Sequence, residues 1–353
     1  MTALATTSIA WILLAVVGLG WIVYAFFNVS AGRREIGSEL ELAANRTPYY
    51  PDEILEGRRL TMVQLYGVIL LAIIVIALPL YWVLEPNRQA GATEGKVNRF
   101  AGWGADLFAT TEDGGFNCAG CHGGMNATGG EAAYTVTNPL TDEVQAVQWK
   151  APALNTALYR FDESEIRFIL DYGRPGSPMA AWGLDGGGPM NFQQVTTLIA
   201  YIASIQIPRE ECSAEEEGDP LCESGHLPAD EQADIEARAR QLVDDGTYAS
   251  YGEALFNNDL ASGAYSCARC HTQGWSYDMP GEPGQGAFGW NLTAGSTAAH
   301  FPDDAEMEEF ISLGSELGQG YGRQGQGSGR MPAFGQLLTD EQIAAVVDYV
   351  RSL

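Results

Sequence analysis

The feature that most constrains this chain is a pentapeptide, Cys-x-x-Cys-His, which occurs twice, at Cys118–His122 and at Cys267–His271. In a helical turn the two cysteines lie near one face, and the histidine that follows brings its imidazole beside them. Residues at this spacing attach a c-type haem, because the thiols form thioether bonds to the porphyrin and the histidine binds the iron. The predicted cofactor-binding residues are Cys118, Cys121, Cys267 and Cys270, and the predicted iron ligands beside them are His122 and His271.

A lone Cys-x-x-Cys has two other interpretations, a redox dithiol and one half of a zinc site. The histidine that follows each motif and the recurrence of the whole pentapeptide disfavour both. We therefore expect this chain to carry two covalently bound haem c groups.

The chain is strongly acidic, with a formal net charge of −26 over 353 residues. Such a field repels polyanions, which argues against nucleic acid as a partner. Two explanations of the acidity stay open. It forms a docking surface for a positively charged protein, or it is a solubility or salt adaptation.

Two apolar stretches precede the motifs, at residues 8–29 and 60–84, and each is long enough to span a bilayer as a helix. A cleaved signal peptide is the competing interpretation of the first stretch. No basic region precedes that stretch, and no clean cleavage site follows it. We predict a transmembrane helical hairpin over residues 1–85.

The orientation of this hairpin follows from its flanking charges. Arginines gather in the loop between the spans, and the first seven residues carry no basic side chain. The positive-inside rule places the loop in the cytoplasm and both termini outside. Covalent haem attachment and disulfide formation belong to that same oxidising side. We therefore expect a protein of the inner (cytoplasmic) membrane, with its haem domains on the extracytoplasmic side.

After a predicted tether at residues 86–99, one order of features occurs twice: a leading helix, the motif, a methionine loop and a closing helix. Such repetition indicates two copies of one module, a first domain at residues 100–206 and a second at residues 247–353. The predicted fold class is mainly α. Apolar spacing and capping signals predict helices over residues 162–172, 193–205 and 304–313, and a last helix from Thr339.

Residues 207–246 form an acidic linker between the two predicted domains. It holds the remaining cysteines, Cys212 and Cys222. Two free thiols are unusual on an exported surface, so we predict a disulfide between them.

The sixth ligand of each iron decides the chemistry. Methionine sulfur raises the potential and gives an electron carrier, whereas an empty position allows peroxide chemistry. Met179 follows His122 by 57 residues and Met331 follows His271 by 60, each after a helix candidate and a glycine-rich loop. Both are predicted axial ligands. Met190 is the alternative in the first domain, because it also has a Gly-Pro context.

The other possible ligands have weaker contexts. His300 is a candidate for a displaced axial role, and His226 is expected at the surface of the linker. The remaining rivals among the methionines are Met125, Met279 and Met307.

These features resemble a membrane-anchored dihaem cytochrome c built from two class I cytochrome c domains. The resemblance includes a Gly-x-x-Leu-Phe helix before each motif, at Gly104–Phe108 and at Gly252–Phe256. In that family a proline carbonyl accepts a hydrogen bond from the axial histidine. Pro152 matches this proline, whereas the second copy has Gly289–Leu292 there and no proline, which leaves that bond open.

Two N-terminal spans followed by two such domains resemble the dihaem subunit of cbb3-type cytochrome oxidases, and equally a dihaem subunit of a bc-type quinol:cytochrome c reductase. The resemblance implies an electron-transfer subunit rather than a catalyst on its own. It would relay single electrons between a quinol-oxidising bc-type module or soluble donor and a terminal oxidase. The implied partners are membrane subunits of either complex, and a soluble cytochrome or other carrier. The alternative is a dihaem cytochrome with its own catalysis, such as peroxidase activity or thiosulfate oxidation.

Overall fold

The computed structural model describes residues 2–35, 57–137, 142–210, 225–257, 266–315 and 331–353, and the fold is mainly helical. The chain divides into two compact units, Met1–Lys96 and Val97–Leu353. The predicted disulfide pair, Cys212 and Cys222, lies outside the described residues.

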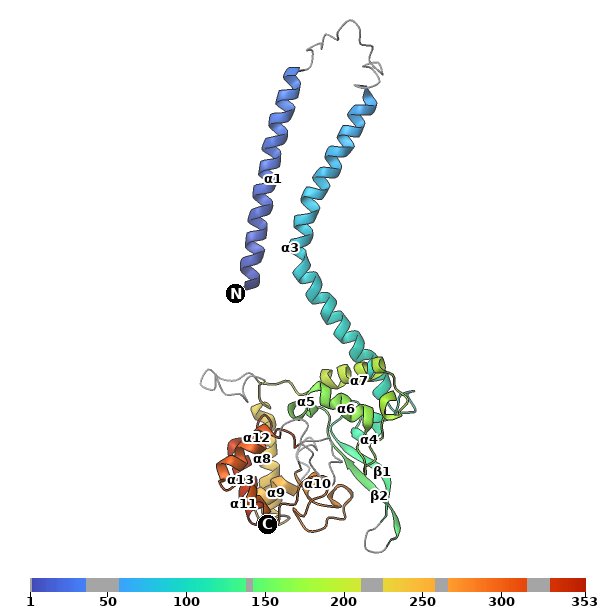
Figure 1. Ribbon diagram of the computed structural model, residues 1–353, viewed down its shortest axis with the longest axis vertical. Helices are drawn as coiled ribbons and strands as arrows, with labels where there is room; N and C mark the ends of the chain where they lie inside the picture. The colour runs from blue at the N-terminus through green and yellow to red at the C-terminus, as the bar shows by residue number, and fades with distance from the viewer. Residues whose placement is uncertain (1, 36–56, 138–141, 211–224, 258–265, 316–330) are drawn as a thin grey trace. The chain divides into compact units, whose positions relative to one another are not determined.

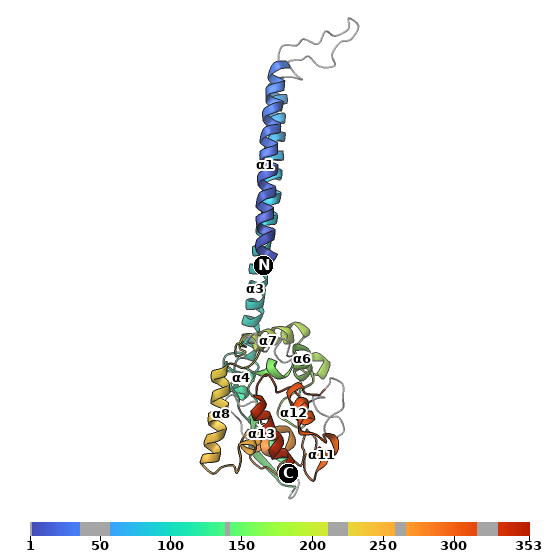
Figure 2. The same ribbon diagram turned by 90° about the vertical axis from the view of Figure 1, so that its left-hand side faces the viewer.

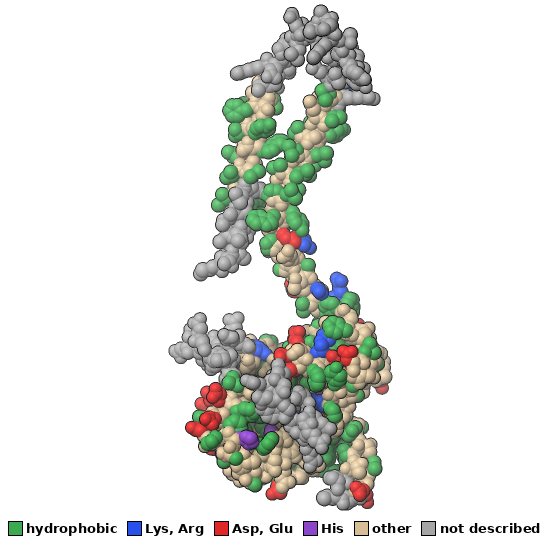
Figure 3. All heavy atoms as spheres, viewed as in Figure 1, with side chains coloured by type: hydrophobic (Ala, Val, Ile, Leu, Met, Phe, Trp, Pro, Cys, Tyr) green, Lys and Arg blue, Asp and Glu red, His purple; other side chains and the backbone are tan. Residues whose placement is uncertain are grey.

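The first unit consists of α1 (Thr2–Glu35) and most of α3 (Arg58–Phe108) (Figure 1). Within the described ranges, one helical segment, Leu60–Phe108, is long and apolar enough to cross a membrane, and α1 contributes the shorter apolar segment Ala15–Ser30. Exposed apolar side chains cover this part of α3 (Figure 3). The second predicted span is thus supported as a membrane-helix candidate, and the first stays a prediction.

Residues 86–99, predicted as a tether, are helical and belong to α3. Their proline and glycine residues suggested a break. The surrounding Ala, Glu, Lys and Arg residues favour a helix, and Glu85 accepts hydrogen bonds from Arg88 Nε at 2.6 Å and Gln89 Nε2 at 3.1 Å. Pairs at these spacings stabilise a helical turn, so the helix continues past Pro86.

The first half of the second unit follows the end of α3. Its core contains the fully buried Phe108 of α3, Met190, and Val195 and Leu198 of α7. Two helices here begin with a capping box, at Asp162 for α6 and Asn191 for α7. The elements are α4 (Cys118–His122), β1 (Gly130–Thr137), β2 (Val144–Ala151), α5 (Ala157–Arg160), α6 (Glu163–Tyr172), η1 (Leu184–Gly186) and α7 (Phe192–Ser204).

A β-hairpin lies where the sequence predicted only loops. β1 and β2 pair antiparallel, from Gly130 opposite Ala151 to Thr137 opposite Val144. Along β2, buried apolar residues alternate with polar ones, and Trp149 is at the centre of the buried row. A period of two is the signal of a half-buried strand. The hairpin corrects the expectation that only loops follow the first motif.

The second half begins with a surface helix and then repeats the helical order. α13 packs against α12, beside which it lies in Figure 2, and also against α9. The predicted helix over 304–313 is confirmed, and the last helix begins after Thr339, whose hydroxyl caps it. The elements are α8 (Ala229–Asp244), α9 (Tyr251–Asn257), α10 (Ala268–His271), η2 (Trp275–Tyr277), α11 (Ser296–His300), α12 (Asp304–Leu313) and α13 (Asp340–Arg351).

The leading helix meets the closing helix in the same way in both halves. A Cβ atom on Gly104 of α3 would lie 2.0 Å from the Thr197 carbonyl oxygen of α7. A Cβ atom on Gly252 of α9 would lie 1.9 Å from the Ala345 carbonyl oxygen of α13. Only glycine permits two helix backbones to approach so closely. The glycine of the Gly-x-x-Leu-Phe segment therefore makes each crossing possible.

Candidate functional site

A cavity of about 500 Å³ is lined by residues from both halves of the second unit. Its volume lies within the range of cofactor sites. Most of the lining is apolar, as a buried cofactor requires. The predicted haem residues that line it are Cys118, Cys121, His122, Met179, Cys267, Cys270, His271 and Met331.

The first motif forms α4, a single helical turn that ends at Gly123 in the left-handed region. His122 is 9% exposed, and its Nδ1 lies 2.8 Å from the carbonyl oxygen of Pro152. A carbonyl can only accept, so this contact places the proton on Nδ1 and leaves Nε2 as the metal-binding nitrogen. Burial lowers the pKa of His122, which favours the neutral imidazole that binds iron.

The second motif achieves the same geometry without a proline. His271 Nδ1 lies 2.8 Å from the carbonyl oxygen of Trp290. The bond needs only a carbonyl in the right place, and every residue has one. Burial again lowers the pKa of the imidazole. The hydrogen bond that the missing proline left open is therefore present. The sequence did not point to Trp290, because Trp290 accepts this bond with its backbone carbonyl rather than its side chain.

Burial raises the pKa of the Cys118 thiol to about 11 and that of the Cys267 thiol to about 12. Zinc sites and redox dithiols depend on cysteines that ionise easily. The raised pKa values of Cys118 and Cys267 are unlike the lowered value of a reactive dithiol. Among the described residues, no group of three or more His, Cys, Asp or Glu side chains is placed to hold a metal ion.

Both methionine loops have the same backbone construction. Gly173 ends α6 with φ 69° and Gly314 ends α12 with φ 73°. A Cβ atom on Gly173 would lie 2.6 Å from the Met179 carbonyl oxygen, and one on Gly314 would lie 2.7 Å from that of Met331. Glycine adopts this conformation without strain and permits each loop to fold back on its helix.

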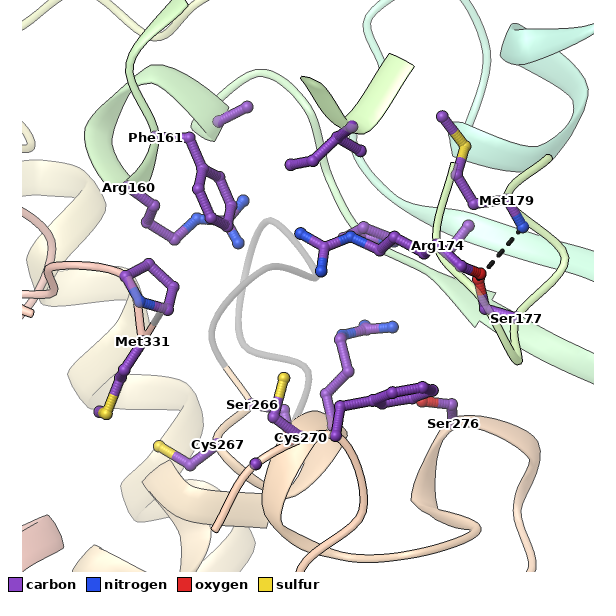
Figure 4. Close-up of a pocket in the computed structure, with 18 of the residues that line it drawn as sticks. Arg160, Phe161, Arg174, Ser177, Met179, Ser266, Cys267, Cys270, Ser276 and Met331 are labelled. Atoms are coloured by element: carbon purple, nitrogen blue, oxygen red, sulfur yellow. Dashed lines mark hydrogen bonds between the residues drawn. The ribbon is translucent and has the colours of Figure 1, made fainter. Parts of the chain in front are cut away.

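A serine also holds each methionine. The Ser177 hydroxyl oxygen accepts from the Met179 backbone N–H at 3.2 Å (Figure 4), and the Ser315 hydroxyl oxygen accepts from that of Met331 at 2.9 Å. The two loops are thus equivalent in construction although their sequences differ.

The other predicted candidates lie in different places. Met190 is 0% exposed, lies in the core of the first half, and does not line the cavity. Met125 and Met279 are exposed. Met307 and His300 do line the cavity, and the His300 ring makes an edge contact with Trp290, with centroids 5.1 Å apart.

The charged side chains that line the described part of the cavity are all cationic: Arg160, Arg174 and Arg269. No Asp or Glu residue is among these lining residues, although the chain is acidic overall. Figure 4 shows the guanidinium groups of Arg160 and Arg174 directed toward one another, and they lie 5.5 and 5.6 Å from the ring centroid of Phe161. Haem carries carboxylates, which guanidinium groups bind. The thiols, imidazoles and thioethers are the groups that attach haem and bind its iron, so the whole set of side chains fits haem.

The motifs, their histidine–carbonyl bonds and the apolar cavity are the features of a c-type cytochrome. The comparison with protein families agrees, because residues 249–350 match the family described as "Cytochrome C oxidase, cbb3-type, subunit III". This match supports a cytochrome c domain with covalently bound haem c in the second half, and it suggests electron transfer in a respiratory context. No curated protein and no solved structure gives a significant match.

Proposed function

We propose that this chain is a membrane-anchored dihaem electron-transfer subunit of a respiratory complex. The observation that carries the proposal is that both Cys-x-x-Cys-His motifs and both serine-held methionines line one cavity. Haem bound there supplies reversible one-electron chemistry at its iron. The cbb3-type match in the second half favours an oxidase or bc-type complex as the setting.

Each part of the cavity has a role in this proposal. His122 with Met179, and His271 with Met331, are the proposed axial pairs. The backbone carbonyls of Pro152 and Trp290 orient the imidazoles and keep their protons on Nδ1. The apolar lining excludes water, and the arginines offset the cofactor carboxylates.

The membrane part of the proposal rests on α3 and on the charge pattern of the sequence. α3 is the proposed anchor, and residues 8–29 are the proposed first span. The arginine-rich loop lies in the cytoplasm, and the haem domains lie on the extracytoplasmic side. There they exchange electrons with membrane subunits of an oxidase or bc-type complex, and with a soluble cytochrome or other carrier. A Cys212–Cys222 disulfide suits that compartment.

The test is spectroscopy of the full-length chain in detergent. Two His/Met haems are expected to be low-spin in both oxidation states and to show a methionine–iron charge-transfer band when oxidised. Reversible one-electron titration of each haem is expected. A high-spin haem that reacts with peroxide, or thiosulfate oxidation by the purified chain, would contradict the carrier function and favour a catalytic dihaem cytochrome.

A further inference from the structure

We infer that the two haem sites exchange arginines: Arg269 of the second motif acts on the first site, and Arg174 of the first methionine loop acts on the second. The inference rests on the proposed dihaem function. Each of these arginines would adjust the reduction potential of the haem in the opposite half. Three observations lead to it, from the motif sequences, the Arg269 contacts and the position of Arg174.

The two motifs differ at the residue before the second cysteine, which is Gly120 in the first and Arg269 in the second. In the first motif a Cβ atom on Gly120 would lie 2.3 Å from Asn117 Oδ1, so a side chain there would have to displace the Asn117 side chain. The second motif has the room, and its side chain reaches across to the first half. The sites are therefore asymmetric in charge although their ligands correspond.

Arg269 contacts the segment that holds the first axial histidine. Its Nη1 donates a hydrogen bond to the carbonyl oxygen of Lys150, near the end of β2. Two residues further along, the carbonyl oxygen of Pro152 accepts a hydrogen bond from His122 Nδ1 at 2.8 Å. Arg269 thus fixes the strand end whose backbone orients His122, which makes it a positioning residue for the first site.

This contact is anchored from both sides. The guanidinium carbon of Arg269 lies 5.1 Å from the ring centroid of Trp275, and Lys150 Nζ lies 4.6 Å from the same ring. Lys150 Nζ also forms an ion pair with Asp278 at 2.7 Å. Trp275 and Asp278 both belong to the second half, so they hold β2 against the second motif.

Arg174 makes the reverse connection. It precedes Met179 by five residues, and its backbone N–H donates to the Met179 carbonyl at 2.9 Å. In Figure 4 its guanidinium group points away from Met179 and toward the middle of the cavity, which Cys267, Cys270 and Met331 of the second half also line.

The consequence is electrostatic. Oxidised haem iron carries one more positive charge than reduced iron, so a guanidinium group in a low-dielectric cavity disfavours oxidation and raises the potential. Removing the charge lowers it. For each arginine we expect a roughly three- to tenfold loss in the equilibrium constant for reduction of the haem in the opposite half, where tenfold corresponds to about 59 mV for one electron.

The test compares Arg269→Gln, Arg269→Lys and Arg174→Gln in the full-length, haem-loaded chain, with Arg238→Gln on the exposed face of α8 as the matched charge control. Redox titration resolves the two haems, and Met331→His marks which one is the second. Arg269→Gln is expected to lower the first potential, Arg174→Gln the second, and Arg238→Gln neither. Arg269→Lys keeps the charge but loses the planar donor group, so it should retain most of the potential.

The inference is overturned if Arg269→Gln moves only the second potential and Arg174→Gln only the first, or if both behave like Arg238→Gln. If Arg269→Gln loses a haem, Arg269→Lys and Arg174→Gln decide the question. Failure of the proposed function has a different signature, since the unsubstituted chain would then lack a second haem or its methionine ligation. Two low-spin His/Met haems whose potentials do not respond to the arginine of the opposite half would refute this inference and leave the proposed function standing.

Discussion

Replacing Met190 and Met179 one at a time separates a core residue from a ligand. Met190 is fully buried in the core of the first half, whereas Met179 lines the cavity. Truncating a buried methionine to alanine costs about 2–5 kcal/mol, because the packing contacts are lost and a cavity remains. For a unit of this size, each kcal/mol lowers Tm by about 2–4 °C. A loss of about 3 kcal/mol in Met190→Ala therefore lowers Tm by about 6–12 °C.

Met190→Ala should keep the methionine–iron charge-transfer band of both haems, because its sulfur does not reach the cavity. Met179→Ala should lose the band of the first haem, with a smaller fall in stability, since its side chain is only partly buried. The assay is a thermal melt by circular dichroism together with the near-infrared spectrum of the oxidised protein. Met190→Leu, which restores most of the volume, is the control and should recover most of the lost stability. The assignment of Met179 as the ligand would be refuted if Met190→Ala lost the charge-transfer band of the first haem and Met179→Ala retained it.

Three further predictions follow from single contacts. Gly252→Ala should destabilise the second half by about 2–5 kcal/mol in chemical denaturation, because the new Cβ atom would lie 1.9 Å from the Ala345 carbonyl oxygen. Gly281→Ala is the control and should have little effect, because a Cβ atom there would lie 3.6 Å from the nearest atom. Met331→His should lower the potential of the second haem in a redox titration and leave haem attachment intact; an unchanged potential would remove Met331 from the iron. In the chain made without haem, the pKa of the Cys118 thiol is raised to about 11, so iodoacetamide should alkylate it roughly 100-fold more slowly below pH 9 than an ordinary cysteine. The alkylation rate should rise as the pH increases toward 11. An ordinary rate at pH 8 would contradict the burial of Cys118.

The sequence was sufficient where side-chain chemistry or helical periodicity carries the information. It located the helix at 304–313 and the N-terminal cap at Thr339, because apolar spacing and capping residues act locally. It also singled out eight candidate haem residues, all of which line one cavity, because thioether attachment and iron ligation require specific residue types.

The features that the sequence did not reveal depend on the backbone or on contacts between the halves. The hydrogen bond from His271 to Trp290 involves a carbonyl, which no residue type marks. The contact from Arg269 to Lys150 joins residues far apart in the chain, and it exists only because β2 packs against the second half. The hairpin at β1 and β2 did have a signal, the alternation along 144–151, but its partner strand follows a run of glycines that is typical of a loop.

The central claim is that one chain carries two covalently attached haems in one cavity, and intact-protein mass spectrometry tests it most directly. The account predicts a mass increase of two haem groups that survives denaturation, because thioether bonds are covalent. Replacing Cys118 and Cys121 by alanine should remove one haem and leave the other, and replacing Cys267 and Cys270 should do the converse. A native chain that carries one haem or none would contradict the account.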